Sequence, residues 1–361
     1  MAKGKKPSKR EDKKMTGTAR TKAKETVRRI APAHNEAEHK YPFWDPKKEV
    51  TETVKLHISV PTYDNTLNLL QDSCVRQALG NSAFGEKLQA QFNFVGSDSL
   101  ICRARDKMAL AFLESDCEWQ LQLDNDIIFP YGLGPDLAKF YANWMEEDIF
   151  NSFLNEGVFR LALSINAIDE ILRSGIQHGK KLVAGLYFWR GGGKNFNEAS
   201  SLFHLGQSDD DLALEFKVRK DNHLYTNMLA TGFLLTHRSV YEGITRAFPE
   251  LEYQIPQNSP KTTSFAFYNP IVTEETRKTK QGTTEVFRFY RSEDYAFAWR
   301  AEQAGFTPCV NMNILLGHMG SHIYSWFDRP MLQKLLFDTY TNPQHHLEKI
   351  VDPKDEKPIP A

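Results

Sequence analysis

The stretch Leu121-Gln-Leu-Asp-Asn-Asp-Ile-Ile-Phe-Pro130 carries the strongest structural signal in this chain of 361 residues. Leucine and glutamine alternate up to the acidic triplet, which is typical of a strand, and an apolar run follows it. Asp124 and Asp126 therefore stand at the carboxyl end of a predicted strand, where open α/β sheets bind ligands. Their mutual repulsion favours a bound cation, and hard divalent ions prefer oxygen ligands. An acidic turn that caps the next helix is the alternative interpretation.

The segments around this stretch alternate between strand and helix patterns. Strands are predicted at 55–61, 92–96, 119–124 and 181–189, and helices at 65–79, 100–113 and from 292 to about 305. The stretch 133–177 is helix-like, and two further apolar runs lie at 228–236 and 284–289. Strands that alternate with helices of this length favour βαβ units and a parallel sheet, so we expect an α/β fold.

The net charge of −1 conceals a basic N-terminus. Residues 1–29 hold twelve Lys or Arg and three acids, a net charge of +9, so the rest of the chain carries −10. Residues 1–30 contain no aromatic side chain, and we expect a disordered basic tail that is either solvated or binds nucleic acid. Residues 31–53 are expected to form an ordered lead-in, and the region 327–361 a peripheral C-terminal extension.

The cysteines and the apolar runs indicate the compartment. The four cysteines form no CxxC pair and show no regular spacing, which favours a reducing environment. No apolar run approaches the ~18 residues that cross a bilayer. The N-terminus lacks the apolar centre of a signal peptide. We therefore expect a soluble cytoplasmic protein without a membrane span, in the host cytoplasm if the chain is viral.

Two other segments hold side chains that suit a catalytic site. Glu293 and Asp294 follow Ser292 at a predicted helix start, where a helix cap is the simpler interpretation. His318 stands between glycines, which let the backbone approach a ligand, and neutral imidazole is a common metal ligand. A helical zinc pair with His322 is the competing hypothesis, and the glycines oppose the helix that it needs.

Two arginines lie just after the second predicted strand. The guanidinium groups of Arg103 and Arg105 could reach a phosphate from that position. Solvated side chains on a helix face are the alternative.

Taken in order, these pieces resemble a GT-A glycosyltransferase, similar to the family-2-like enzymes of bacteriophage and bacterial genomes. The matching pieces lie at 58–63, 104–106, 124–126, 183–187, 230–235, 292–297, 304–306 and 317–320. The family often has Asn at the position of Asp106. The helical stretch 133–177 and the loop 248–284 are longer than in the family, so the resemblance does not name the acceptor.

The resemblance implies an α/β fold of one continuous central sheet flanked by helices. A Rossmann-like nucleotide-binding half would be joined to a mixed-sheet acceptor half. The catalytic domain would span 54–326, with the nucleotide-sugar-binding half at 54–130, a helical insertion at 131–180 and the acceptor half at 181–326.

The resemblance also implies transfer of a sugar from a nucleotide-diphosphate donor to an acceptor hydroxyl. Asp126 and His318 would hold Mn²⁺ or Mg²⁺, which offsets the charge of the departing diphosphate, and Asp124 would contact the donor ribose or the ion. Asp294 would be the general base of an inverting attack. Glu293 would bind acceptor hydroxyls or exchange roles with Asp294.

Further positions implied by the resemblance surround the two substrates. The nucleotide end would contact Arg105 and Arg103, and Pro61, Thr62 and Tyr63 would line the base pocket. Trp189 and Gly232 would lie on the acceptor side, with core packing as the alternative for both.

Two other classes of protein remain open from the sequence. A metal-dependent nuclease or nucleic-acid-binding protein fits the acidic cluster and the basic tail, but the strand order fits it poorly. An inactive, structural glycosyltransferase-like subunit is the third possibility, and the intact acids and His318 argue against it. For a transferase, the acceptor is either a saccharide or other envelope or capsid component, or modified phage DNA held by the basic tail.

Overall fold

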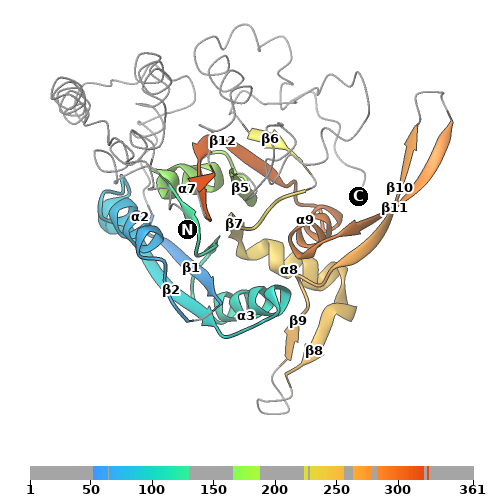
Figure 1. Cartoon of the computed structure of the whole chain (residues 1–361), viewed down its shortest axis with the longest axis horizontal. Helices are drawn as coiled ribbons and strands as arrows, with labels where there is room; N and C mark the ends of the chain where they lie inside the picture. Colours follow the sequence, from blue (N-terminus) through green and yellow to red (C-terminus); the bar gives the residue numbers. More distant parts are fainter. Residues whose placement is uncertain are drawn as a thin grey trace, which may run out of the picture.

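The computed structural model describes residues 52–63, 65–129, 166–187, 223–226, 228–255, 263–278, 283–320 and 323–324. These residues form a mixed α/β structure around a seven-stranded sheet with the strand order β2-β1-β3-β7-β5-β12-β6 (Figure 1). The strands of this sheet are β1 (Val54–Thr62), β2 (Leu88–Gly96), β3 (Trp119–Leu123), β5 (Leu182–Leu186), β6 (His223–Tyr225), β7 (Phe233–His237) and β12 (Cys309–Leu315).

Trp119 and Gln120, which are neighbours on β3, show which helices cover each face of the sheet. The helices are α2 (Leu69–Gly80), α3 (Ile101–Glu114), α7 (Ala167–Ile176), α8 (Arg238–Ala247) and α9 (Glu293–Gln303). Gly175 of α7 packs so tightly against the Trp119 ring that a Cβ would not fit. Gln120 donates to the Met108 carbonyl of α3 and accepts from Tyr241 of α8. Because successive side chains point to opposite faces, α7 covers one face and α3 and α8 the other.

The central sheet has a parallel half and a mixed half. β1 pairs in parallel with β2 and β3, and β5 pairs in parallel with β12. β7 runs antiparallel between β3 and β5, and β6 runs antiparallel to β12. The predicted α/β fold is confirmed, and the parallel sheet that the strand–helix alternation favoured holds only in part, because β6 and β7 run antiparallel. A buried apolar run has the same pattern in either direction, so the sequence could not reveal this reversal.

The predicted elements are present with shifted ends. α2 begins at Leu69, later than expected, because the Asn68 side chain accepts from the backbone N–H groups of Leu70 and Gln71 and so caps the helix. β2 begins earlier than predicted, at Leu88, and β5 ends at Leu186. In the run 228–236 only the second half is a strand.

One helix and several strands were not predicted. The helix is α8, and the strands β8 (Glu252–Gln254), β9 (Thr263–Phe265) and β10 (Ile271–Lys278) occupy the region expected to be an extended loop. β10 pairs antiparallel with β11 (Thr284–Arg291), and this hairpin extends away from the central sheet (Figure 1). β11 leads through Ser292 directly into α9, so the hairpin adjoins the predicted catalytic acids.

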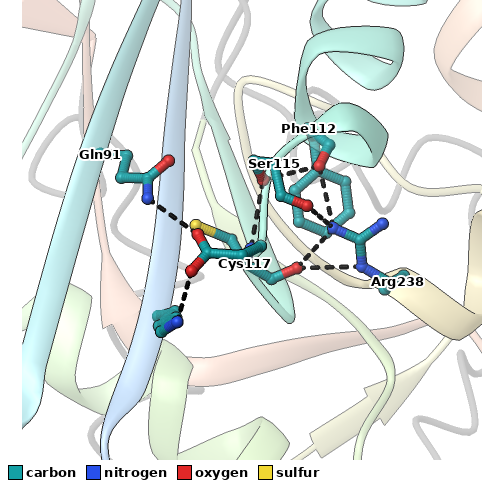
Figure 2. Close-up of polar contacts among 7 residues, drawn as sticks. Gln91, Phe112, Ser115, Cys117 and Arg238 are labelled. Carbon is teal, nitrogen blue, oxygen red and sulfur yellow. Dashed lines mark hydrogen bonds and ion pairs between the residues drawn. The ribbon is translucent and has the colours of Figure 1, made fainter.

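Arg238, the first residue of α8, joins that helix to the end of α3. Figure 2 shows its guanidinium group directed at backbone carbonyls near the C-terminus of α3. It donates to the carbonyls of Phe112, Leu113, Ser115 and Cys117 at 2.7–3.1 Å. These include carbonyls that the last turn of a helix leaves unpaired, and the charge suits the negative end of the helix dipole.

A small three-stranded sheet completes the region around the end of β3. It has the order β14-β13-β4 and consists of β4 (Ile127–Ile128), β13 (Gly317–Met319) and β14 (Ile323–Tyr324). β13 pairs antiparallel with β4 and sets His318 opposite Ile127. The histidine segment is therefore a strand, as the glycines indicated, and not a zinc-binding helix.

Several predicted segments lie outside the described residues. They are the basic tail, most of the lead-in, most of the 131–180 insertion and the C-terminal extension. Within the described ranges, no helix has the length and apolar character needed to cross a membrane.

Candidate functional site

The acidic triplet forms a turn between β3 and β4. The alternative in which it caps a following helix is wrong, because the next element is the strand β4. Asn125 holds this turn in place: its Oδ1 accepts from the Asn68 backbone N–H at 2.9 Å, and its Nδ2 donates to the Thr66 carbonyl at 2.9 Å. The middle residue of the triplet therefore ties the turn to the start of α2, and the two carboxylates flank it.

Asp126 and His318 meet across the β4–β13 pairing. His318 Nε2 lies 3.5 Å from Asp126 Oδ2, and the Met319 backbone N–H donates to the Asp126 carbonyl at 2.7 Å. Both side chains are partly exposed. The structure thus brings together the two residues expected to hold a divalent ion, although 192 positions separate Asp126 from His318 in the sequence.

Asp124 is bound to a buried arginine. Arg105 Nη2 donates to both carboxylate oxygens of Asp124, at 3.0 and 3.2 Å, and Nη1 donates to Gln122 Oε1 at 3.3 Å. Burial opposes the guanidinium charge, but Asp124 and Glu293 outweigh this effect, and the pKa of Arg105 lies above its ordinary value. Arg105 therefore stays charged beneath the site, although it was expected to contact a nucleotide directly.

Tyr187 and Gly232 connect Asp124 with His318. The Gly232 N–H donates to the Tyr187 hydroxyl at 3.0 Å, and the Gly232 carbonyl accepts from the Asp124 N–H at 2.9 Å. The Tyr187 ring meets His318 edge-on, with ring centroids 5.4 Å apart. A Cβ at Gly232 would lie 2.5 Å from the Tyr187 hydroxyl, so this close approach requires glycine.

The first turn of α9 supplies two acids to the same region. Burial, then the charge of Glu293, raises the pKa of Asp294 from 3.8 to about 6. The Ser292 hydroxyl donates to Asp294 Oδ1, and the Tyr295 N–H donates to the same oxygen at 2.8 Å. Ser292 occupies the N-cap position, but its side chain caps no backbone group, which corrects the expected serine cap.

Electrostatic coupling joins α9 to the end of β3. Burial, and after it the charges of Asp124 and Asp294, raises the pKa of Tyr187 above its ordinary value. The charge of Arg105 favours the ionised form of Asp294. Acids at the end of β3 and at the start of α9 therefore act electrostatically on the same two buried residues, Arg105 and Tyr187.

The residues predicted to surround the nucleotide are less closely grouped. Pro61 and Thr62 end β1, and Tyr63 directly after them has 82% of its surface exposed. Arg103 Nε donates to both oxygens of Asp98, at 2.8 and 2.9 Å, rather than to the acidic turn. The roles of these residues in binding a nucleotide stay predictions.

The other predicted residues divide as follows. Trp189 lies outside the described residues. In the part of the chain that the structure describes, no three or more His, Cys, Asp or Glu side chains gather as a metal site. Asp126 and His318 remain as a candidate pair, while both oxygens of Asp124 accept from Arg105.

The sequence did not single out Tyr187 or Gln122, because a tyrosine or glutamine in an apolar strand looks like part of the core.

Comparison with known proteins assigns no family. No protein-family model matches the chain, and no curated protein matches it. The GT-A resemblance therefore rests on the motifs and their order along the chain.

Proposed function

We propose that this chain is a metal-dependent glycosyltransferase that moves a sugar from a nucleotide-diphosphate donor to an acceptor hydroxyl, with inversion. One observation carries the proposal. The Asp126–His318 pair and the acids of α9 adjoin the same buried Tyr187–Arg105 centre, at the end of a strand in the parallel half of the sheet. In this proposal, the Asp126–His318 pair would bind the cation and an acid of α9 would accept the proton within one site.

The fold supports this proposal at the level of architecture. The strands β2, β1 and β3 are parallel, as a nucleotide-binding half requires, and they continue into a mixed half through β7. A single continuous sheet of this kind is what the GT-A resemblance implies. The acidic turn lies at the carboxyl end of β3, where open α/β sheets bind ligands.

The donor side suits a hard divalent ion with an incomplete protein shell. Mg²⁺ sites commonly use one or two carboxylates together with substrate phosphates, so Asp126 fits such a partial set, and the His318 imidazole beside it would be a further ligand for a transition ion. When bound, Mn²⁺ or Mg²⁺ would act as a Lewis acid that offsets the charge of the leaving diphosphate. Asn125 holds the turn that carries Asp126.

The acceptor side suits proton removal by Asp294. With a pKa of about 6, its carboxylate is largely ionised at neutral pH and is more basic than an ordinary aspartate. The acceptor oxygen would attack the anomeric carbon while its proton passes to Asp294. The bond from that carbon to the diphosphate breaks, and the diphosphate leaves with the electron pair. Glu293, the preceding residue, would contact other acceptor hydroxyls.

A ligand screen tests the proposal without knowledge of the acceptor. Purified full-length protein is heated with UDP-, GDP- and dTDP-sugars in the presence and absence of Mn²⁺. A ligand that binds the native state adds RT ln(1 + [L]/Kd) to stability, so at least one nucleotide sugar should raise the melting temperature only with the ion. Stabilisation by duplex DNA with Mn²⁺, together with strand cleavage and no response to any nucleotide sugar, would favour the nuclease instead.

A further inference from the structure

The face of β3 that carries Asp124 is polar along its whole length. Gln120 and Gln122 precede Asp124 at alternate positions, and both glutamines are completely buried in a central strand between β1 and β7. Burying an amide is unfavourable unless its hydrogen bonds are made. Two buried glutamines at alternate positions of one strand therefore need an explanation other than core packing.

Gln122 is the link between the site and this buried polar face. Its Oε1 accepts from Arg105 Nη1 at 3.3 Å, and its Nε2 donates to the Tyr268 hydroxyl at 2.6 Å and to the Tyr241 hydroxyl at 3.1 Å. The amide nitrogen is thus held by two hydroxyls and, at 3.4 Å, by Gln120 Oε1, while the amide oxygen accepts from the guanidinium group. Arg105 in turn donates to both oxygens of Asp124.

The two tyrosines are themselves fixed. Their hydroxyls lie 3.0 Å apart, and that of Tyr241 donates to Gln120 Oε1 at 2.5 Å. The backbone N–H of Tyr268 donates at 3.0 Å to Asp106, which neighbours Arg105 on α3. Tyr268 also stacks on Phe297 of α9, with ring centroids 4.4 Å apart. The polar network therefore joins α3 and α8, and the stacking of Tyr268 on Phe297 connects it to α9.

We propose that Gln122 and Tyr268 are positioning residues that hold the Arg105 guanidinium in the orientation that binds both oxygens of Asp124. The placement of Arg105 stands on the contacts alone. Its consequence for the donor end of the site rests on the proposed function. A guanidinium group has a fixed planar fork of donors, so a glutamine oxygen on one side and a carboxylate on the other define its plane.

The test compares Gln122→Met with Gln120→Met in the full-length protein. Both changes remove a buried amide of the same strand face, but only Gln122 contacts Arg105. NMR of the Arg105 guanidinium, assigned by its loss in Arg105→Lys, measures rotation of the Nη groups. Losing the restraint should accelerate this rotation at least about tenfold in Gln122→Met and leave it unchanged in Gln120→Met. Tyr268→Phe should show an intermediate acceleration.

Calorimetry with UDP and Mn²⁺ then measures the effect on the site. Loss of one buried hydrogen bond should weaken binding about tenfold in Gln122→Met and less than about twofold in Gln120→Met. Unchanged guanidinium rotation in Gln122→Met, or the same change in both variants, would overturn the positioning role. If the wild-type protein binds no nucleotide, the proposed function fails, while the rotation measurement still decides the role of Gln122. If Gln122→Met does not fold, Gln122→Glu replaces it, because glutamate has the same shape as glutamine. Its carboxylate would be a second one on Arg105 and should still alter the rotation of the guanidinium group.

Discussion

At the scale of single residues, Asp294 has an environment that disfavours its own charge. Burial and the adjacent Glu293 both raise its pKa, while Ser292, the Tyr295 N–H and Arg105 oppose the rise only in part. A carboxylate that is half-buried and unusually basic is costly to the fold and useful as a proton acceptor. Perturbed groups of this kind concentrate at functional sites.

Replacing Asp294 by Asn should lower kcat by about 10²–10⁴ with little change in donor affinity, because the amide cannot accept the acceptor proton. In the wild type, kcat/KM should rise with pH up to about 6 and level off above it, since the base must be ionised. The variant should lose this dependence. Steady-state rates from pH 4.5 to 8.5 give both results, and Glu293→Gln serves as the matched control.

Thermal unfolding checks the same residue without substrate. The folded-state pKa of Asp294 is raised above its unfolded value, so the stability linked to its proton is present below about 4 and is lost as pH rises through about 6. Asp294→Asn should therefore melt above the wild type at pH 8 and close to it at pH 4. A lower melting temperature at pH 8 would mean that the carboxylate serves the fold rather than the reaction.

At the scale of elements, the start of β7 packs against the end of β5. Gly232 precedes β7 and lies against Tyr187, which follows β5, and its carbonyl also binds the backbone of Asp124. The ends of β3 and β5 and the start of β7 therefore meet at Gly232.

Substituting Gly232 by Ala should displace Tyr187 and lower the free energy of unfolding by about 1–3 kcal/mol, because the new Cβ has no room beside the phenol. Chemical denaturation measures this loss. In a Tyr187→Ala background the same substitution should cost little, since the obstructing ring is gone. An equal cost in both backgrounds would show that the contact with Tyr187 is not the cause.

Arg238 tests the junction of α3 and α8. Arg238→Ala leaves carbonyls at the end of α3 without their charged donor and should destabilise the protein by about 2–4 kcal/mol. Arg76→Ala, which removes an exposed i,i+4 pair with Asp72, should cost far less, because solvent screens that pair. Urea midpoints at constant m-value measure both. Similar losses in the two variants would contradict the capping role of Arg238.

The sequence predicted elements well where apolar periodicity is strong and less well elsewhere. β1, β3 and α3 matched closely, because their patterns are long and regular. α8 was missed because it is short and contains Gly243 and β-branched residues, which lower helix propensity. Gly243 packs against Phe306 with no space for a Cβ, a tertiary reason that no local pattern shows.

At the scale of the whole molecule, the sequence predicted the acids and the histidine of the candidate site but not the buried residues between them. Asp126, His318 and Asp294 were recognisable because acids at a strand end and a histidine between glycines stand out in sequence. Tyr187 directly follows an apolar strand and Gln122 lies between two leucines, so their importance follows only from long-range packing. The antiparallel direction of β7 was equally hidden, although it sets Gly232 beside Asp124.

The charge distribution of the whole chain leads to a prediction about the acceptor. The net +9 of residues 1–29 contrasts with −10 on the rest, so the segment would offset repulsion of a polyanion. If DNA is the acceptor, the full-length chain should bind duplex DNA with an affinity that falls steeply between roughly 50 and 300 mM salt, as counterions are released. A chain that begins at Ile30 should lose most of this binding. Equal, salt-insensitive affinities in the two chains would remove DNA as the acceptor.

Release of nucleoside diphosphate from nucleotide sugars with Mn²⁺ tests the central claim most directly, because slow hydrolysis of the donor needs no added acceptor. The wild type should turn over at least one UDP-, GDP- or dTDP-sugar and lose that activity in EDTA. Asp126→Asn should be inactive at an unchanged melting temperature, since Asp126 is partly exposed and its loss relieves repulsion in the turn. No turnover of any donor by the wild type, or full activity of Asp126→Asn in EDTA, would contradict the account.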